Sequence, residues 1–273
     1  MPHAHGATQL RRAATVAALI AFAAATPAAA DEPVRFDVRL AASTHYSADV
    51  QMTHTITYDM NSVLRKLAGS KADPVTILEQ RSVDVAAAPN GAVDETIADT
   101  RHYGGAHPKN TSVVRRTTNY KGVIASNGKR TPTGEPLVDA GDGALAELPE
   151  GPVAVGQTWT FSRQILVDRE LGQGTMTYTD TLTKIDDRNG HRIAVIAVKG
   201  QGRVDVAKDL KAKGFQTTDM TFAGSAEFDL TSGLPGVQHY TAHAQWNTRI
   251  LMTHLGLIFD DTYDAAAWTP KGH

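Results

Sequence analysis

Apolar and polar residues alternate with a period of two through most of this chain. Between residues 46 and 58 every second residue is apolar except His54, and the residues between them are polar. Side chains of a β-strand point alternately to its two faces, so this pattern predicts a long strand with one buried face. Similar patterns predict further strands at residues 34–40, 75–88, 92–103, 113–125, 158–171, 175–186, 191–200, 220–230, 236–251 and 257–268.

Turn signals separate these segments. Asn-Gly pairs at residues 90–91, 127–128 and 189–190 favour tight turns, because both residues tolerate a positive φ. The three residues Gly172-Gln173-Gly174 are expected to join two strands as a hairpin.

Two short stretches have helix signals instead. A helix with Asn61 or Ser62 as its N-cap is expected to extend through Leu67, where Gly69 follows as a stop signal, and a second is expected at residues 206–213 with Asp205 as its N-cap. Roughly ten to twelve strands with short connections predict a mainly β fold. We expect a large antiparallel curved sheet or a partly open barrel with one or two short helices.

Prolines and glycines are concentrated in residues 126–152. This composition is typical of a long loop or linker, and it separates an N-terminal β half at residues 31–125 from a C-terminal β half at residues 153–273. The two halves are expected to form either one continuous domain or two. After the loop, Gly156 permits a bend before Trp159, which we expect to anchor the core of the second half.

The first thirty residues have the pattern of a secretory signal peptide. Arg11 and Arg12 precede an apolar run at residues 13–25, and an A-x-A cleavage site ends at Ala30. The paired arginines leave the twin-arginine route open beside ordinary Sec export. Either route predicts a periplasmic or secreted protein that begins near Asp31 after cleavage.

Composition narrows the classes of partner. The chain has no cysteine, which excludes a disulfide and a lipid-modified cysteine. No run after Ala30 approaches the ~18 apolar residues of a membrane helix, so a soluble product without an integral membrane segment is expected. The 27 basic and 29 acidic residues nearly balance, which gives no reason to expect nucleic acid as a partner.

No familiar catalytic or cofactor motif withstands inspection. Residues 126–129 match S-x-x-K, but that motif requires a helix and these residues include an Asn-Gly turn. Residues 122–129 resemble a P-loop with one residue too many between the glycines. We therefore assign no catalytic residue, metal site or cofactor.

Several ionisable residues stand out by their place in the strand pattern. His54 is the one ionisable group on an apolar face, where a satisfied core histidine is the more common outcome than a ligand. Asp180 interrupts another apolar face, so it needs a partner or a perturbed pKa if that face is buried. The acidic run Asp260, Asp261 and Asp264 is expected to be a solvated sheet edge.

His239 and His243 occupy one face of a predicted strand, and Trp246 occupies the other. The two imidazoles would be about 13 Å apart, too far to share a zinc ion. Their face is either the solvated outer surface or the wet lining of a lumen. As ligand-binding candidates we name Asp180, His239, His243 and Trp246.

Two segments give the chain a resemblance to known proteins. Leu148-Pro149 precedes Val155-Gly156-Gln157-Thr158-Trp159, and Asp229-Leu230-Thr231-Ser232-Gly233 follows later. Over residues 148–250 the chain resembles uncharacterised secreted bacterial β-proteins, which carry a leucine-proline, then valine-glycine-x-threonine-tryptophan segment and an aspartate-leucine-x-x-glycine turn. More distantly the layout is similar to the half-barrels of periplasmic lipoprotein carriers, which imply an apolar cavity under helices. This chain has little helix to cover a sheet, and no functional residue is carried over.

Three hypotheses of function follow. Export, long two-faced strands and the missing catalytic motifs favour a non-catalytic β-protein that binds an apolar or amphiphilic ligand, such as a lipid, or another envelope component. The alternative is a hydrolase with an unrecognised site that uses Asp180 or the His239 and His243 row. The third is a purely structural or interaction module, and the sequence leaves the ligand and the oligomeric state open.

Overall fold

The computed structural model describes residues 32–69, 73–89, 92–105, 112–132, 147–168, 172–250 and 253–271. Residues 31–273 form one compact unit. The expected signal peptide at residues 1–30 and the Asn-Gly turn at residues 90–91 lie outside the described residues. Within the described ranges, no helix is long and apolar enough to cross a membrane.

Long antiparallel strands make up most of the described chain. The first half contains β1 (His45–Met60), β2 (Val75–Ala87), β3 (Ala92–Gly105), β4 (Ser112–Ile124) and β5 (Arg130–Pro132). The second half contains β6 (Thr158–Asp168), β7 (Gly172–Arg188), β8 (His191–Val206), β9 (Thr218–Asp229), β10 (Leu234–Ile250), β11 (Thr253–Ala265) and β12 (Thr269–Pro270). Two short helices, α1 (Ser62–Ala68) and α2 (Lys208–Ala212), complete the described elements. The predicted mainly β fold is confirmed.

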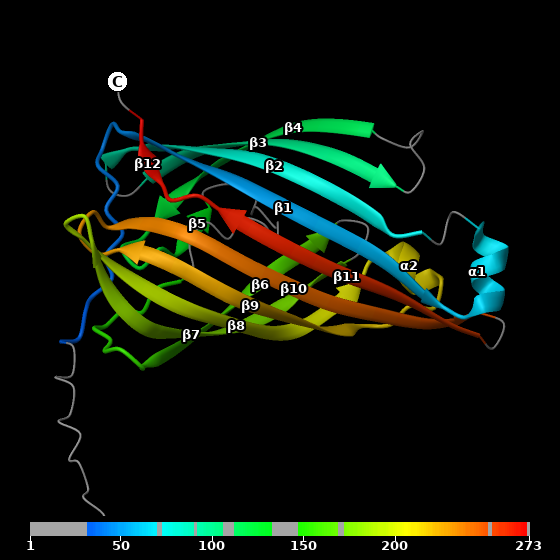
Figure 1. The fold of residues 1–273 in the computed structure, drawn as a ribbon. Helices are drawn as coiled ribbons and strands as arrows, with labels where there is room; N and C mark the ends of the chain where they lie inside the picture. Colours follow the sequence, from blue (N-terminus) through cyan, green and yellow to red (C-terminus); the bar gives the residue numbers. More distant parts are fainter. Residues whose placement is uncertain are drawn as a thin grey trace, which may run out of the picture. The chain divides into compact units, whose positions relative to one another are not determined.

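All of these strands belong to one sheet. Its order is β5-β4-β3-β2-β1-β11-β10-β9-β8-β7-β6, and β12 pairs with β1. Each half is therefore a meander, and the two meanders join where β1 pairs with β11. Figure 1 shows that the sheet curls strongly along this strand order. Among the described strands, β5 and β6 do not pair with each other, so the predicted curved sheet is open.

One face of the sheet is buried and the other is exposed. In β7, buried and exposed residues alternate from Gly172 to Asp180, as expected for a strand whose side chains point alternately to two faces. Apolar side chains of the buried positions form one hydrophobic cluster that includes residues of both halves. We term the buried side the inner face and the exposed side the outer face.

The segment before β1 runs across one end of the sheet. Val34 forms an isolated bridge with Val153, and the N–H of Val38 donates to the carbonyl of Ser126 at 2.7 Å. The strand predicted at residues 34–40 is wrong beyond this bridge. Its backbone groups bond to separate loops instead of to one neighbouring strand.

Aromatic side chains fasten this segment to the core. The Phe36 ring lies 5.8 Å from the Trp159 ring and 5.5 Å from the Phe228 ring, between centroids. The Trp159 indole N–H donates to the carbonyl of Glu147 at 3.0 Å. Trp159 is half-buried and packs against the hydrophobic core, which includes residues of both halves and is not a separate core of the second half.

The glycines between β6 and β7 differ from the sequence prediction. Gly172 begins β7 and Gly174 lies within it, opposite Val204 of β8. A Cβ on Gly174 would lie 2.0 Å from the carbonyl oxygen of Arg203, so the glycine permits a close approach of two backbones. The turn predicted at residues 172–174 is therefore wrong, and residues 169–171 lie outside the described ranges.

Both helices lie at the end of the sheet opposite the Phe36 segment (Figure 1). The Asn61 side chain accepts hydrogen bonds from the N–H groups of Val63 and Leu64, so of the two residues that the sequence offered, Asn61 is the N-cap of α1. Helix α2 begins after Ala207, whose side chain makes no capping bond, so the cap predicted at Asp205 is wrong. Asp205 instead accepts from the Thr217 hydroxyl at 2.7 Å.

Candidate functional site

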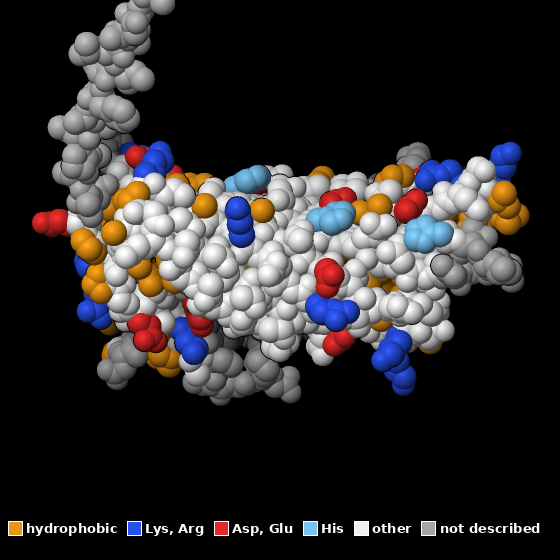
Figure 2. Space-filling view, turned by 90° about the horizontal axis from the view of Figure 1, so that it is seen from below, with side chains coloured by type: hydrophobic (Ala, Val, Ile, Leu, Met, Phe, Trp, Pro, Cys, Tyr) orange, Lys and Arg blue, Asp and Glu red, His pale blue; other side chains and the backbone are white. Residues whose placement is uncertain are grey.

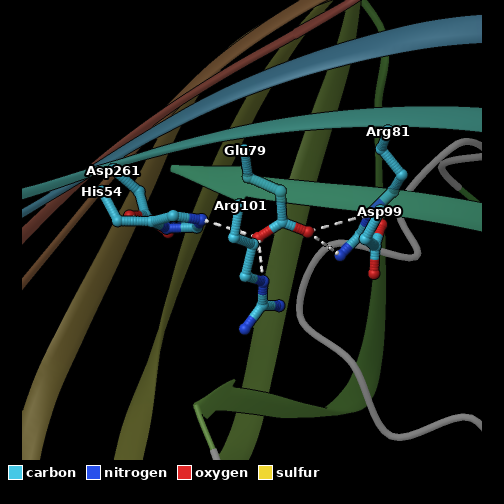
Figure 3. Close-up of polar contacts among 6 residues, drawn as sticks. All are labelled: His54, Glu79, Arg81, Asp99, Arg101 and Asp261. Carbon is cyan, nitrogen blue, oxygen red and sulfur yellow. Dashed lines mark hydrogen bonds and ion pairs between the residues drawn. The ribbon is translucent and has the colours of Figure 1, made fainter. Parts of the chain in front are cut away.

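Several charged side chains gather at one place on the apolar inner face. Strand register places Glu79 opposite Arg101 and Arg81 opposite Asp99, on β2 and β3. Six side chains of β1, β2, β3 and β11 form this group, which we term the charged cluster: His54, Glu79, Arg81, Asp99, Arg101 and Asp261 (Figure 3).

Glu79 is the centre of the charged cluster. Its side chain is fully buried, and one carboxylate oxygen lies 2.7 Å from a terminal nitrogen of Arg81. The other oxygen lies 2.7 Å from Nε of Arg101 and 3.3 Å from Nε2 of His54. Burial alone would raise the pKa of Glu79, but the hydrogen bond from His54 and the two guanidinium charges outweigh it and lower the pKa to about 2.

His54 lies between two carboxylates. Its Nδ1 is 2.5 Å from Oδ1 of Asp261, and its Nε2 faces Glu79. Burial lowers the pKa of His54, but the hydrogen bonds with both carboxylates dominate and raise it to about 9. The imidazole is therefore a satisfied core histidine, as expected, and it is protonated at neutral pH.

The remaining carboxylates of the cluster also have cations beside them. Nε of Arg81 donates to Oδ1 of Asp99 at 2.7 Å. Burial raises the pKa of Asp99 and of Asp261 above the usual range, while Arg81 and His54 respectively act against this rise. The three basic side chains of the cluster, His54, Arg81 and Arg101, thus lie beside its three carboxyl groups.

The charged cluster is accessible from the α1 end of the inner face. The Arg101 side chain is 24% exposed, whereas that of Glu79 is 0% exposed. Along β1, buried and less buried residues alternate up to Met52, and residues 53–58 are then half-buried on both faces. Val114 of β4, opposite Arg101, is 46% exposed on the inner face.

A line of aromatic rings lies on the same face. We term it the aromatic ladder: Phe161, Tyr178, Phe222, Tyr240 and Tyr263. Successive ring centroids are 5.0, 5.3, 4.8 and 5.5 Å apart, within the range of favourable aromatic contacts. Gly200 of β8 lies between Tyr178 and Phe222, and a Cβ there would lie 3.0 Å from the Tyr178 ring. The glycine thus leaves room for the two rings to meet across β8.

The ladder and the cluster share one cross-strand row. Pairing partners follow one another across the sheet as Phe161, Tyr178, Gly200, Phe222, Ala242, Asp261 and His54. The row is aromatic on β6, β7 and β9, has small residues on β8 and β10, and carries ionisable groups on β11 and β1. One line of the inner face is therefore amphipathic.

Asp180 and Trp246, two of the predicted site residues, are on the inner face. Asp180 is fully buried, and among the described residues neither of its carboxylate oxygens has a hydrogen-bond partner. Burial raises its pKa to about 7, against the charge of Arg163, so the expected perturbation is present. Trp246 is also fully buried, and its indole N–H has no partner in the described part of the chain.

The other two predicted residues, His239 and His243, are on the outer face. His239 Nδ1 lies 2.5 Å from Oδ1 of Asp264, and His243 Nδ1 lies 2.7 Å from Oδ1 of Asp260. Both imidazole side chains are more than half exposed. Figure 2 shows histidine side chains on the surface, with acidic side chains near them and Lys and Arg side chains elsewhere on the same view. The structure therefore separates the four candidates into two pairs on opposite faces.

Strand β11 differs from its predicted role. It lies between β1 and β10 in the sheet, so the acidic run is not at a sheet edge. Asp260 and Asp264 are on the outer face beside the histidines, whereas Asp261 points inward to His54. Beside His243 and Asp260 the outer face has a hollow of about 280 Å³, bordered mainly by threonine and alanine.

Sequence reasoning missed most of the charged cluster. Glu79, Arg81, Asp99 and Arg101 occupy every second position of two predicted strands, where the neighbouring residues of the same face are apolar. Charged residues at apolar positions in two adjacent strands are the signal that predicts a buried ion pair. Among the described residues, no group of three or more His, Cys, Asp and Glu side chains is arranged to hold a metal ion.

Comparisons with known proteins give no family. No family model matches the chain, and no curated protein matches it. Among solved structures, an outer membrane channel from Pseudomonas putida F1 aligns with a TM-score of 0.27 and 9% identity, over 86% of this chain and 99% of that chain. A mutant of the Rh. blastica porin aligns with a TM-score of 0.25 and 7% identity, over 81% and 99%. Likenesses this low carry no argument about function.

Proposed function

We propose that this protein is exported and binds an amphiphilic ligand with an anionic head group on the inner face of its curved sheet. The apolar part of the ligand would lie along the aromatic ladder, and the head group would lie beside the charged cluster. The observation that carries this proposal is the shared cross-strand row, in which aromatic rings on β6, β7 and β9 are followed, after Ala242, by the pair of Asp261 and His54.

The partly exposed guanidinium groups favour an anionic head. Among the side chains of the charged cluster on β1, β2 and β3, that of Arg101 on β3 is the most exposed. Arg163 on β6 is also half-buried and lies over the Tyr178 ring, with its guanidinium carbon 5.0 Å from the ring centroid. Guanidinium groups recognise carboxylate and phosphate through paired N–H donors.

The exposure pattern supports access from the α1 end. Half-buried residues on both faces of β1 beyond Met52, and the exposed Val114, leave the inner face accessible there. At the opposite end, Phe36 packs between Trp159 and Phe228. A ligand would therefore enter beside Arg101.

Native mass spectrometry of protein purified from the organism that makes it tests the proposal. We expect a bound species that is released on denaturation and extracted by organic solvent. A series of ligands with the same alkyl chain and a carboxylate, phosphocholine or trimethylammonium head tests the charge preference. Absence of any bound species, together with no binding in this series, would rule out the proposal, and equal affinity for all three heads would rule out the anionic preference.

A second candidate is a hydrolase on the outer face. Ser225, His239 and Asp264 are consecutive pairing partners across β9, β10 and β11, and the same row order recurs with Thr221, His243 and Asp260. Directly opposite residues have Cβ atoms about 5 Å apart, so a hydroxyl, an imidazole and a carboxylate lie in sequence. Sheet pairing engages the backbone N–H groups here, which leaves a poor oxyanion site.

Ester hydrolysis separates the two candidates. Turnover of a short activated ester that is lost in both Ser225→Ala and His239→Gln would support the hydrolase. Turnover that is absent, or unchanged in these variants, would remove its support.

A further inference from the structure

Helix α1 is largely exposed, with Leu64 and Ala68 half-buried. None of its seven residues is buried. Local interactions determine where the helix begins and ends, because Asn61 caps its first turn and Gly69 ends it with a φ of 56°. A helix of this length gains most of its stability from packing in ordinary proteins, so its exposed position calls for a binding partner.

The composition of α1 combines apolar and basic side chains. Val63 is 62% exposed and Leu67 is 79% exposed, and residues four apart lie on the same side of a helix. Arg65 and Lys66 lie in the last turn, and the first turn has no acidic residue. Among the described residues neither basic side chain forms an ion pair, although Arg65 donates a 3.4 Å hydrogen bond to the carbonyl of Tyr58.

Helix α2 lies at the same end of the sheet but has a different surface. It contains Asp209 in its first turn, and Leu210 packs against the core. No large apolar side chain of α2 is among the exposed ones in the described part of the chain. The combination of exposed apolar and basic groups therefore distinguishes α1 from its neighbour. Figure 2 shows hydrophobic and basic side chains side by side at the end where Figure 1 places α1.

We propose that α1 docks on the surface of a bilayer that contains anionic lipids. Val63 and Leu67 would enter the boundary between head groups and acyl chains, while Arg65 and Lys66 would contact lipid phosphates. Exposed apolar side chains flanked by lysine and arginine are the features that bind short segments to anionic membranes. Two apolar and two basic groups predict weak, reversible binding that falls as salt is added.

This docking is independent of ligand binding on the inner face, although both occur at the same end of the sheet. A bilayer at α1 would lie beside the opening near Arg101. A variant can therefore lose membrane binding and keep ligand binding, or the reverse, and the two losses can be measured separately.

Vesicle flotation of the full-length mature protein tests the proposal. We expect the protein to float with vesicles of phosphatidylglycerol and phosphatidylcholine in equal amounts, and not with pure phosphatidylcholine. The double variants V63S/L67S and R65Q/K66Q should each lose about tenfold in apparent affinity. Their melting temperatures should stay at the wild-type value, because none of the four side chains is buried.

The matched control is K208Q/K211Q, which removes two exposed lysines of α2 at the same end. It should bind vesicles like the wild type. Equal loss in this control, or unchanged binding in R65Q/K66Q, would overturn the proposal, as would wild-type protein that does not float with either vesicle. Val114→Glu places a carboxylate opposite Arg101 on the inner face, where it should weaken binding of the anionic ligand. Flotation of this variant should be unchanged, so failure of either proposal is recognised separately.

Discussion

Asp261 lies directly opposite His54 on the β1 and β11 pair, with its Oδ1 2.5 Å from the imidazole Nδ1. The second ring nitrogen faces Glu79, which two arginines also hold. The imidazolium therefore links the carboxylates of two strands inside the sheet. This pair joins the two meanders electrostatically at the place where they pair.

The first prediction concerns the pH dependence of this pair. The pKa of His54 is about 9 in the folded protein against a usual value of 6.5, so the stabilisation is fully present below pH 6.5 and is lost as the pH rises through 9. The free energy of unfolding should fall between pH 7 and pH 10 by more in the wild type than in His54→Gln. Urea denaturation of both proteins across this range measures the two changes in free energy. An NMR titration in which the His54 imidazole has its midpoint near pH 6.5 would contradict the prediction.

The second prediction concerns Glu79. Glu79→Gln leaves the buried Arg81 and the half-buried Arg101 and His54 without their shared carboxylate, which should cost about 3–5 kcal/mol of stability. The control is Asp94→Asn, which removes an exposed partner of Lys121 at 3.6 Å and should cost less than about 1 kcal/mol. Urea denaturation at pH 7 compares them, and similar small losses in both variants would refute the assigned role of Glu79.

The third prediction is that Asp180→Asn stabilises the protein at high pH. The folded-state pKa of Asp180 is raised to about 7 from 3.8, so the unfolded chain ionises first and wild-type stability falls as the pH rises between these values. The variant should equal the wild type at pH 4 and exceed it at pH 8 by roughly 2–4 kcal/mol.

Asp219→Asn is the control for Asp180, because the Asp219 side chain is 85% exposed. Its stability should follow the wild type at both pH values within about 0.5 kcal/mol. Thermal unfolding at pH 4 and pH 8 is the measurement. A loss of stability in Asp180→Asn at pH 8 would show that the carboxylate has a stabilising partner.

The fourth prediction concerns the aromatic ladder. Gly200→Ala places a methyl group 3.0 Å from the Tyr178 ring and 3.1 Å from Cβ of Phe222, so the rings must move apart at a cost of about 1–3 kcal/mol. Gly151→Ala adds the same methyl group where no atom lies within 4 Å, and it should be neutral. Calorimetry measures the melting temperatures of both variants, and near-ultraviolet circular dichroism reports the packing of the rings. Equal melting temperatures in the two variants would contradict the prediction.

Much of the fold could be predicted from the sequence. Alternation with a period of two indicates strands directly, and β1 and β9 agree with their predicted ranges to within a few residues. The segment at residues 34–40 has the same alternation but is not a strand. Local pattern cannot tell a residue that pairs with a neighbouring strand from one that bonds to separate loops.

The candidate site could be predicted only in part. The buried environment of Asp180 follows from its own strand, because the neighbours two residues away are apolar. The contact between His54 and Asp261 depends on pairing of residues 207 positions apart, and one sequence contains no information on that register. The sequence does not decide the face of His239 for the same reason, since only the direction of curling decides which face is inside.

The central claim is that a ligand binds on the inner face. The most direct test compares the binding of an anionic amphiphile to the wild type and to two valine variants of β4. Val114 and Val113 are adjacent exposed valines of β4 on the inner and outer face respectively, and each can be replaced by glutamate. Calorimetric titration with a long-chain fatty acid should give an affinity about tenfold lower in Val114→Glu, because the new carboxylate lies beside the expected head group, and within about twofold of wild type in Val113→Glu. Equal affinities in all three proteins, or no binding by the wild type, would contradict a ligand site on the inner face.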